Sequence, residues 1–345
     1  MGEARRAARS RAGAAAGRPQ REERIEPLHD PDPVLQAAWW YFVEDLSQAQ
    51  IADRLGVSRA SVHNYLRQAR ESGMVHVSVD AAVTARSRLA REVSSRFDLE
   101  AVYLAPDPPP GAAGDGPPDA EREMRHVAKA AAMWLDGLLP KGASVGVAWG
   151  ETMYGVASQM PRRARGDLTF VQIVGSMASP FGFNAEACTS LIADRLGAAC
   201  VNLYAPAVVS DASVARTLLD EPVIRQQIDR LNAVDVAIFA VGLCDASSHV
   251  VQAGVATLEE LSQYHASGAR AVIAGRFIDG AGRPLAGRLD GRVIGITLEQ
   301  LGQVARRVLV SAGTRRSAAL RAALSGGFAT HLITDTASAG ALLSD

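Results

Sequence analysis

The 345-residue chain has three cysteines, two lysines and no apolar run long enough to cross a membrane, which requires roughly 20 residues. Cys188, Cys200 and Cys244 lie far apart and lack the spacing of zinc ligands, so neither a disulfide framework nor a metal site is expected. The start of the chain is charged throughout and lacks the apolar segment of a secretory signal. We therefore expect a soluble, cytoplasmic protein without a metal, a cofactor or a membrane partner.

Acidic and basic side chains almost balance. The chain has 36 Lys and Arg residues against 37 Asp and Glu residues, for a formal net charge of −1. This balance disfavours a protein that binds polyanions over its whole surface, so any contact with DNA must come from a local arrangement. Hydrophobic residues make up 48% of the chain, enough to fill a sizeable core. The length suits two domains better than one.

Residues 46–79, LSQAQIADRLGVSRASVHNYLRQARESGMVHVSV, have the pattern of a helix-turn-helix. Ser47 can cap a first helix, whose apolar positions follow at helical spacing until Gly56 ends it. Ser58 can cap a second helix that Gly73 ends. So tight a turn makes the two helices cross steeply and leaves the outer face of the second helix free. The alternative is a helical hairpin whose polar face is only solvated. The motif A-x-x-L-G-V-S-x-x-[ST]-V is much more specific than amphipathicity alone, so it disfavours this alternative.

The outer face of the second helix carries side chains that suit DNA. In such motifs the first exposed turns of this helix enter the major groove. Arginine pairs with guanine, asparagine pairs with adenine, and an alanine methyl can contact a thymine methyl. The residues expected on or near this reading face are Arg59, Ala60, Ser61, His63, Asn64 and Arg67. The residues better placed for phosphates, which fix register without reading sequence, are Ser47, Gln48, Ser58 and Arg70.

The segments around this motif complete a small all-α domain. Asp32 and Pro33 can open a third helix, expected over 34–43. Residues 74–79 alternate like a strand, which predicts a short wing. Residues 1–30 are rich in Arg and Ala and poor in apolar anchors, which favours a disordered tail. Its seven arginines are either solvated or add salt-dependent contacts to DNA phosphates.

Beyond the motif the pattern changes to apolar strands that alternate with helices. Continuously apolar strands in this alternation indicate an α/β domain with a mainly parallel sheet covered on both faces. The expected strands are 100–105, 144–148, 168–174, 199–203, 234–241, 271–277, 293–296, 308–312 and 331–334. The expected organisation is a tail (1–30), a winged helix-turn-helix domain (31–80), a linker helix (81–98) and the α/β domain (99–345).

Glycine follows four of the expected strands, where ligands of such sheets bind. Glycine lets a ligand approach the backbone, and the free N–H groups of a following helix attract anions. Any α/β protein needs glycine at strand ends, so each one alone is weak evidence. Together with nearby Thr and Arg side chains they favour a small polar or phosphorylated ligand. The four positions are Gly150, Gly175, Gly242 and Gly313.

Several further motifs follow the helix-turn-helix in order along the chain. They are VGVAWGETM (145–153), APAVVSDASVARTLLDEPVI (205–224), AGRFIDGAGRP (274–284), IGITLEQL (294–301) and the closing SAGTRRSAALRAALSGGFATHLITDTASAGALL. With these motifs the chain resembles, over about residues 33–343, the SorC-type sugar-binding transcriptional regulators, a family related to the deoxyribonucleoside and central glycolytic repressors. The resemblance implies a fold similar to sugar-phosphate isomerases and glucosamine-6-phosphate deaminase. It also implies that 99–345 is an effector-binding and oligomerisation domain, in which a sugar or sugar phosphate changes the DNA affinity of a homo-oligomer, a tetramer or dimer.

The resemblance also assigns effector-binding positions, carried over motif by motif. With Gly242 from the strand-end pattern, the candidates are Gly150, Glu151, Thr152, Gly175, Ser176, Asn184, Arg276, Asp279, Gly313, Thr314, Arg315 and Arg316. Arg276 has a second interpretation, as a structural ion-pair partner of Asp279 or of another acid.

Three departures from the family pattern affect the expected site. Glu151 stands where members usually have a small or basic residue. An acidic group there disfavours phosphate but can accept hydrogen bonds from sugar hydroxyls; alternatively it is a surface carboxylate favoured by the helix dipole. Val272 stands where many members have Asp, which removes a polar group. Arg315 or Arg316 must replace the lysine usual in the last loop.

These observations predict a DNA-binding regulator and not an enzyme, with an operator affinity controlled by a small sugar, polyol or sugar phosphate. One alternative is an isomerase or deaminase with an accessory DNA-binding head, because the fold hosts such enzymes. The loops offer it no compact acid and base pair beyond Asp211, Asp245 and His249. A second alternative is an assembly protein whose α/β domain only oligomerises, which the polar strand ends disfavour.

Overall fold

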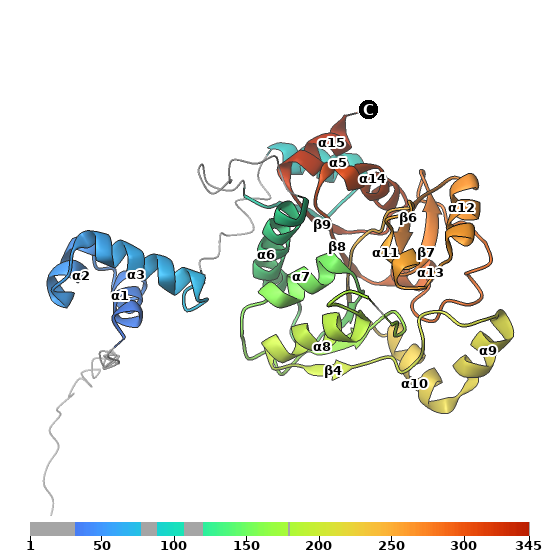
Figure 1. Cartoon of the computed structure of the whole chain (residues 1–345), viewed down its shortest axis with the longest axis horizontal. Coiled ribbons are helices and arrows are strands. Elements are labelled where there is room, and N and C mark those ends of the chain that lie inside the picture. Colours follow the sequence, from blue (N-terminus) through green and yellow to red (C-terminus); the bar gives the residue numbers. More distant parts are fainter. Residues whose placement is uncertain (1–31, 77–87, 107–119, 179, 345) are drawn as a thin grey trace, which may run out of the picture. The chain divides into compact units, whose positions relative to one another are not determined.

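The computed structural model describes residues 32–76, 88–106, 120–178 and 180–344, and the chain divides into two units, Met1–His76 and Val77–Asp345 (Figure 1). The predicted tail, the end of the wing (77–79), the start of the linker helix and residues 107–119 lie outside the described residues. Among the helices that are described, none is long and apolar enough to cross a membrane.

The first unit contains the three predicted helices of the helix-turn-helix domain. They are α1 (Pro33–Phe42), α2 (Gln48–Leu55) and α3 (Arg59–Glu71). Asp32, Ser47 and Ser58 cap their N-termini, each accepting a backbone N–H in the first turn. Gly56 ends α2 in the left-handed conformation, with φ of 67°. The caps and the glycine stop predicted from the sequence are confirmed.

The core of this unit is formed where one side of each helix meets the other two. Ile51 of α2 and Val62 and Leu66 of α3 are fully buried, and α1 supplies Ala37. Val75 donates its backbone N–H to Ala69 at 3.0 Å, which holds the chain against the end of α3. Residues 74–76 therefore form no strand, so the described part of the predicted wing is not a strand.

The second unit is built on a parallel sheet, as predicted. Its described strands are β1 (Ala101–Leu104), β2 (Ser144–Val147), β3 (Thr169–Gln172), β4 (Ala199–Val201), β5 (Val236–Phe239), β8 (Arg306–Val310) and β9 (His331–Thr334). These seven pair in the order β1-β9-β8-β5-β2-β3-β4, and every pair is parallel. The order reverses between β2 and β5, because the chain builds out to β4 on one side and then returns to the other side of β2.

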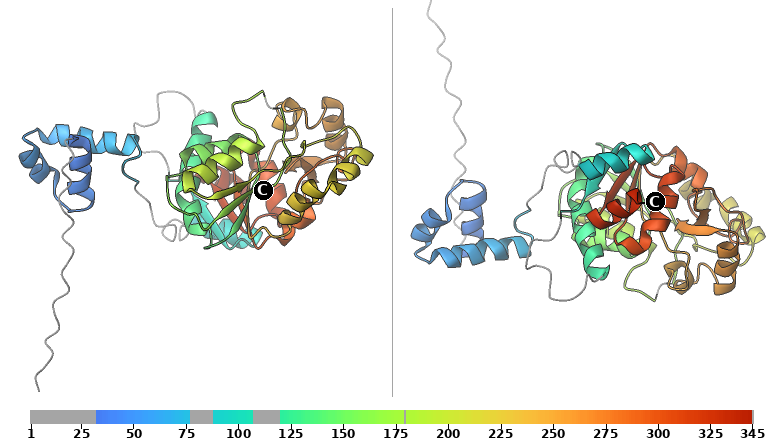
Figure 2. Two further views of the ribbon diagram at one scale, coloured as in Figure 1. Left: turned by 90° about the horizontal axis from the view of Figure 1, so that it is seen from below. Right: turned by 90° about the horizontal axis from the view of Figure 1, so that it is seen from above.

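Helices cover both faces of this sheet (Figure 1 and Figure 2). Alternate residues of β5 and β8 enter two separate cores: Ile238 and Val308 face one, and Phe239 and Leu309 face the other. The first core is closed by α6 (Ala120–Leu138), α7 (Glu151–Gln159) and α8 (Ala185–Leu196). The second is closed by α5 (Arg88–Phe97), α13 (Leu298–Gln303), α14 (Ser317–Ser325) and α15 (Thr336–Leu343).

The segment predicted as a linker helix packs into the second unit. Ala90 and Val93 of α5 are buried in its core, and α5 contacts α15 and β1. Arg96 donates to the backbone carbonyl of Leu343 at 3.0 Å. The described part of this helix is thus held by the second unit.

Two predicted strands are wrong. Residues 271–277 form parts of an antiparallel hairpin, β6 (Ala269–Ile273) and β7 (Arg276–Asp279), outside the parallel sheet. Ala274 and Gly275 have φ of 50° and 80°, a left-handed turn that no strand can continue through. Residues 293–296 make only isolated bridges to Val174 and Val208. The remaining helices are α9 (Ala212–Asp220), α10 (Pro222–Leu231), α11 (His249–Gln252), α12 (Leu258–Ala266) and the 3-10 turn η1 (Thr314–Arg316).

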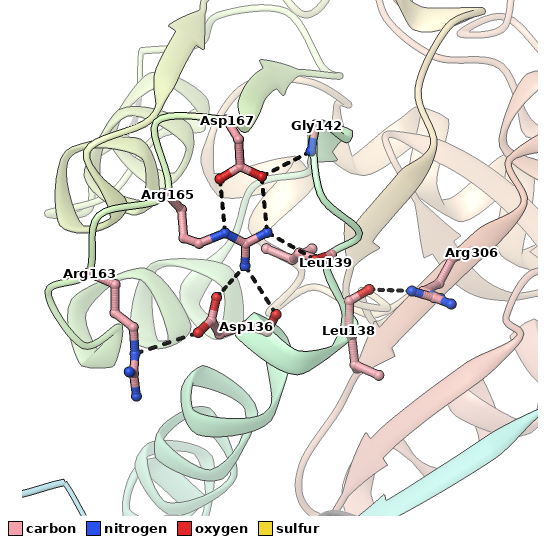
Figure 3. A network of polar contacts seen from close by, with 8 residues as sticks. All are labelled: Asp136, Leu138, Leu139, Gly142, Arg163, Arg165, Asp167 and Arg306. Atoms are coloured by element: carbon pink, nitrogen blue, oxygen red, sulfur yellow. Dashed lines mark hydrogen bonds and ion pairs between the residues drawn. The ribbon is translucent and has the colours of Figure 1, made fainter. Parts of the chain in front are cut away.

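An arginine network ties together the loops that precede β2 and β3 (Figure 3). Arg165 donates to the carboxylates of Asp136 at 2.6 Å and of Asp167 at 3.1 Å, and to the carbonyl of Leu139 at 3.1 Å. Asp167 in turn accepts the backbone N–H of Gly142 at 2.9 Å. Hydrogen bonding from Arg165 lowers the pKa of Asp167 to about 2. One guanidinium thus joins the end of α6 to both strand starts.

We expect Arg165→Ala to lower the free energy of unfolding by about 1–3 kcal/mol, because carbonyl and carboxylate partners lose a charged donor. Arg163→Ala is the matched control: its side chain is 50% exposed and its contact with Asp136 is 3.5 Å long. We expect this control to cost less than about 1 kcal/mol. Urea unfolding followed by circular dichroism measures both, and equal losses would contradict the structural importance of Arg165.

Candidate functional site

A cavity of about 760 Å³ lies in the second unit, at the carboxyl ends of the neighbouring strands β8, β5 and β2. The order of the sheet reverses between β2 and β5, and the crevice at such a reversal is where ligands bind in open α/β sheets. The loops after these three strands form its wall, with the hairpin turn at Ala274 and Gly275 and the first turn of α6. The predicted glycines at Gly150, Gly242 and Gly313 all reach it.

The predicted effector residues fall into two groups. The cavity brings together Gly150, Glu151, Thr152, Gly242, Gly313, Thr314, Arg315 and Arg316. The residues outside its wall are Gly175, Ser176, Asn184, Arg276 and Asp279. The first group comes from three separate loops, so only the folding of the parallel sheet makes them neighbours.

The first loop of the cavity leads from β2 into α7. Gly150 begins the helix with φ of 129°, a conformation that favours glycine, and no side chain caps the helix there. Glu151 lies in the first turn, where the helix dipole favours a negative charge. Thr152 follows and is 5% exposed. The start of α7 thus offers backbone N–H groups, a carboxylate and a hydroxyl to the cavity.

The last loop, between β8 and α14, already uses many of its donors. The backbone N–H of Gly313 donates to Asp335 Oδ2 at 2.9 Å. Arg315 Nη2 donates to Asp245 Oδ2 at 3.0 Å and to Ser247 Oγ at 2.7 Å. Burial opposes the ionisation of Asp245, but its hydrogen bonds from Ser247 and Arg315 lower its pKa overall. This loop is therefore fastened to the loop after β5.

Arg316 links the first and last loops. Its Nη1 donates to the carbonyl of Ala312 at 3.3 Å, and its Nη2 lies 3.9 Å from Glu151 Oε2. Burial lowers the pKa of Arg316, and the charge of Glu151 opposes that change. At 3.9 Å the two charged groups attract each other without a hydrogen bond between them.

Several cavity residues were not predicted from the sequence as effector contacts. Glu121 and Glu123 reach the wall from the first turn of α6, and no pattern in the sequence connects that helix to these loops. Ser248 is 3% exposed and its Oγ has no hydrogen-bond partner among the described residues. His249 is predicted from the sequence only as a candidate catalytic group. The polar residues that follow the strand ending at Val241 are the signal in the sequence that could have indicated Ser248 and His249 as cavity residues.

His249 lies between the cavity and an aromatic pair. Its ring centroid is 4.8 Å from that of Phe181 and 5.5 Å from that of Phe183. Burial lowers the pKa of His249, with Glu151 opposing and Arg316 adding to the shift. The imidazole is therefore held toward its neutral form, in which one ring nitrogen donates and the other accepts.

Gly175, Ser176 and Asn184 have structural contacts outside the cavity. Gly175 donates to the carbonyl of Ile294 at 3.0 Å, and a Cβ at this position would lie 2.5 Å from the carbonyl oxygen of Pro206. Ser176 exchanges backbone hydrogen bonds with Ala205 and Ala207. Asn184 caps α8, accepting from the N–H of Ala187 at 2.7 Å. Close backbone packing accounts for this glycine.

Arg276 and Asp279 make no ion pair with each other. Arg276 donates to the carbonyls of Ile296 at 3.1 Å and of Asp290 and Val293 at 3.4 Å, and burial lowers its pKa. Asp279 pairs instead with Arg283, whose backbone and side chain both donate to it and lower its pKa. The described contacts of both residues organise the chain around the hairpin.

The helix α3 of the first unit carries the predicted DNA-reading residues. Arg59, His63 and Asn64 are exposed, and no side-chain hydrogen bond occupies them among the described residues. Ala60 is exposed beside them, whereas Ser61 is half-buried with its Oγ 2.9 Å from Ser58 Oγ. Arg67 is exposed and pairs with Glu71 at 3.3 Å. A free polar surface therefore occupies the first turns of this helix.

The predicted phosphate contacts lie at the helix ends. Ser47 and Gln50 form a reciprocal capping box at the start of α2, and Gln48 follows it. Ser58 caps α3, and Arg70 is exposed near its end with Nε donating to the carbonyl of Leu66 at 3.1 Å. Capping leaves further N–H groups at the starts of both helices available to an anion. No group of three metal-ligating side chains lies together anywhere in the described parts of the chain.

Two family models match the chain. The family described as "Putative sugar-binding domain" matches residues 81–344 and therefore most of the chain. The family described as "Sigma-70, region 4" matches residues 39–72, the segment of the helix-turn-helix. These two matches coincide with the two units of the structure.

Relatives and solved structures agree with these matches. The chain is 35% identical over 323 residues to "Uncharacterized transcriptional regulator YjhU" of Escherichia coli (strain K12), covering 94% of this chain and 98% of the relative. It is 28% identical to the "Deoxyribonucleoside regulator" of Bacillus subtilis (strain 168), covering 90% and 97%. The crystal structure of the full-length sorbitol operon regulator SorC from Klebsiella pneumoniae has a similar fold, with a TM-score of 0.74 at 21% identity over 90% of this chain and 98% of that one.

These relatives are transcriptional regulators and not enzymes, which confirms the choice of a regulator over an isomerase or deaminase. Of the three candidate acid and base groups, His249 lines the cavity. Asp211 caps α9, accepting from the N–H groups of Ser213 and Val214, and lies outside the cavity wall. Asp245 is bound to Arg315.

We expect Gly313→Ala to lower the free energy of unfolding by about 1–3 kcal/mol, because alanine is strained in this backbone conformation. Gly313 has φ of 85°, and a Cβ there would lie 3.4 Å from Glu123 Oε2. Gly137→Ala is the matched control, since nothing lies within 4 Å of its Cβ position in α6. It should raise stability by about 0.4–1 kcal/mol. Thermal unfolding measures both, and a neutral Gly313→Ala would contradict the strain.

Proposed function

The chain belongs to the SorC-type family of sugar-binding transcriptional regulators, and we propose that a sugar, polyol or sugar phosphate in the cavity controls its affinity for an operator. The observation that carries the proposal is the cavity of about 760 Å³ at the reversal of strand order. A cavity of this size suits a small carbohydrate, and its wall mixes apolar side chains with a few polar groups. Such a regulator acts on the chromosome and hence in the cytoplasm.

The exposed face of α3 supports sequence-specific contact with DNA. Arg59 and Asn64 are exposed in its first two turns, with their hydrogen-bonding groups unoccupied by other described residues. These two side-chain types form bidentate pairs with guanine and adenine in the major groove. Because the whole chain is nearly neutral, this local surface has to supply the specificity.

A chain of contacts leads from the cavity to α5, the first described helix that follows the DNA-binding unit. Asp335, which accepts the N–H of Gly313 in the cavity wall, also caps α15 through the N–H of Ser338 at 2.6 Å. The helix α15 packs on η1 on one side and on α5 on another. A ligand that moves the last loop therefore displaces a cap, a helix and then α5. We propose that a homo-oligomer, a tetramer or dimer, converts this into a change in the spacing of its DNA-reading helices.

For DNA binding, we expect Arg59→Ala and Asn64→Ala to weaken binding to a duplex selected by the wild-type protein by about 1–3 kcal/mol each. Binding to a random duplex should change little. Arg70→Ala should weaken both duplexes equally, because phosphate contacts carry no sequence information. Fluorescence anisotropy at a fixed salt concentration measures all six affinities.

The assignment of base-reading residues would be wrong if all three variants lost equal affinity for the selected and random duplexes. Arg195→Ala, on the last turn of α8 in the second unit, serves as the control for loss of one positive charge. It should leave both affinities unchanged.

For effector control, we expect Thr152→Ala and Arg315→Ala to raise the effector concentration that gives half of the maximal change in binding to the selected duplex. The effector used is the compound, from a panel of sugars, polyols and sugar phosphates, that changes binding to the selected duplex most. Loss of one hydrogen bond predicts an increase of about 2- to 10-fold. Anisotropy of the labelled duplex gives the concentration directly.

Thr217→Ala is the matched control for this experiment, because Thr217 lies on α9 and outside the cavity wall. Unchanged half-maximal effector concentrations for Thr152→Ala and Arg315→Ala would place effector binding elsewhere. Turnover of a sugar phosphate by the purified protein at enzyme-like rates would instead support the isomerase or deaminase alternative.

A further inference from the structure

We propose that the effector is an uncharged, hydroxyl-rich compound, a sugar or polyol without a phosphate group. This rests on the proposed function and concerns the same cavity. The alternative ligand, a phosphate ester, requires backbone N–H groups and cationic side chains that are free to surround an anion with two negative charges. The last loop differs from that requirement because its donors are already bound, and the first loop places a carboxylate beside its free N–H groups.

The last loop has few donors left for a phosphate. The N–H of Gly313 is donated to the carboxylate of Asp335. Arg315 is bound to Asp245 and Ser247, and Arg316 is bound to the carbonyl of Ala312 and attracted to Glu151. A phosphate at this loop would have to break hydrogen bonds that the protein already makes, so much of its binding energy would be lost.

The formal charge of the wall also opposes a phosphate. Three carboxylates, Glu121, Glu123 and Glu151, line the cavity with the guanidinium groups of Arg315 and Arg316. Glu121 is paired with Arg125 and Arg315 with Asp245, each at 3.0 Å, so Glu123 and Glu151 stand against Arg316. Glu123 Oε2 lies 3.4 Å from the position that a Cβ would occupy on Gly313, so a carboxylate already stands over the last loop. Glu151 occupies the first turn of α7, where the helix dipole would otherwise attract the anion. Burial holds His249 toward its neutral form by lowering its pKa, so it adds little positive charge.

The same wall is well suited to hydroxyl groups. A carboxylate accepts hydrogen bonds only, and a sugar hydroxyl can donate one. Glu151 lies beyond hydrogen-bond distance of Arg316, so the described ion pair leaves its oxygens able to accept from a ligand. Thr152 in the first turn of α7 adds a hydroxyl to the wall, which can donate to or accept from a ligand hydroxyl.

Apolar side chains complete a site for an uncharged ligand. Trp149, Val241, Val250 and Val272 line the cavity beside these polar groups. They offer surface to the C–H groups of a sugar or polyol, which alternate with its hydroxyls. A wall that combines apolar area with hydrogen-bond acceptors and small hydroxyl groups can fix the orientation of a ligand that carries no charge.

The experiment compares matched pairs of compounds on the full-length protein. The pairs are erythritol and erythritol 4-phosphate, D-ribose and D-ribose 5-phosphate, D-sorbitol and D-sorbitol 6-phosphate, and D-glucose and D-glucose 6-phosphate. A ligand bound only by the folded protein raises its melting temperature. We expect at least one uncharged member to raise it, and its phosphate ester at equal concentration to raise it less or not at all. Isothermal titration calorimetry then gives the affinities for that pair.

Variants of the carboxylates test the cause. Glu151→Gln should lower the affinity for the uncharged ligand by about tenfold, because a charged acceptor is replaced by a neutral one. The double variant Glu123→Gln/Glu151→Gln should bind the phosphate ester about tenfold more tightly than the wild-type protein does. Glu299→Gln is the matched control, since Glu299 lies in the first turn of α13 outside the cavity wall, and it should change neither affinity.

The outcomes distinguish a failure of this inference from a failure of the proposed function. A phosphate ester that binds the wild-type protein as tightly as its uncharged partner, or more tightly, overturns this inference and leaves the proposed function standing. A panel in which neither class changes the melting temperature overturns carbohydrate control itself. Unchanged affinity for the phosphate ester in the double variant contradicts the role given to the two carboxylates.

Discussion

Burial of the parallel sheet on both faces is the constraint on which the rest of the second unit depends. Because α6, α7 and α8 cover one face and α5, α13, α14 and α15 the other, strand side chains such as Phe239 and Ile238 must be apolar. Polar groups are therefore confined to the two ends of the strands. At the amino ends Arg165 joins the loops, and at the carboxyl ends the loops diverge where the strand order reverses and leave the cavity.

The charged side chains that line the cavity also hold its loops together. Arg315 binds Asp245 and Ser247 in the loop after β5, and Arg316 lies 3.9 Å from Glu151 in the loop after β2, so the groups that connect these three loops are also those that face a ligand. Asp335 extends the arrangement, since it holds the last loop and begins α15, which packs on α5. The predicted linker helix is thus part of the unit that contains the cavity.

Sequence patterns correctly predicted the features that depend on interactions between neighbouring residues. The caps at Ser47 and Ser58 and the stop at Gly56 follow from backbone groups within one turn. The strands that failed were decided by more distant contacts. The turn at Ala274 and Gly275 splits an apolar run into a hairpin, and Arg276 binds the carbonyls of Asp290, Val293 and Ile296.

By itself the sequence determined a helix-turn-helix, a doubly covered parallel sheet and glycines at its strand ends, because each depends on spacing and burial along one segment. Only the tertiary structure decided which strand ends are neighbours. It brought Gly150, Gly242 and Gly313 to one cavity, moved Gly175 into backbone packing with Pro206, and placed Glu123 of a distant helix over the last loop. The order of strands in a sheet is set by how all the helices pack together, and no single stretch of the sequence contains that information.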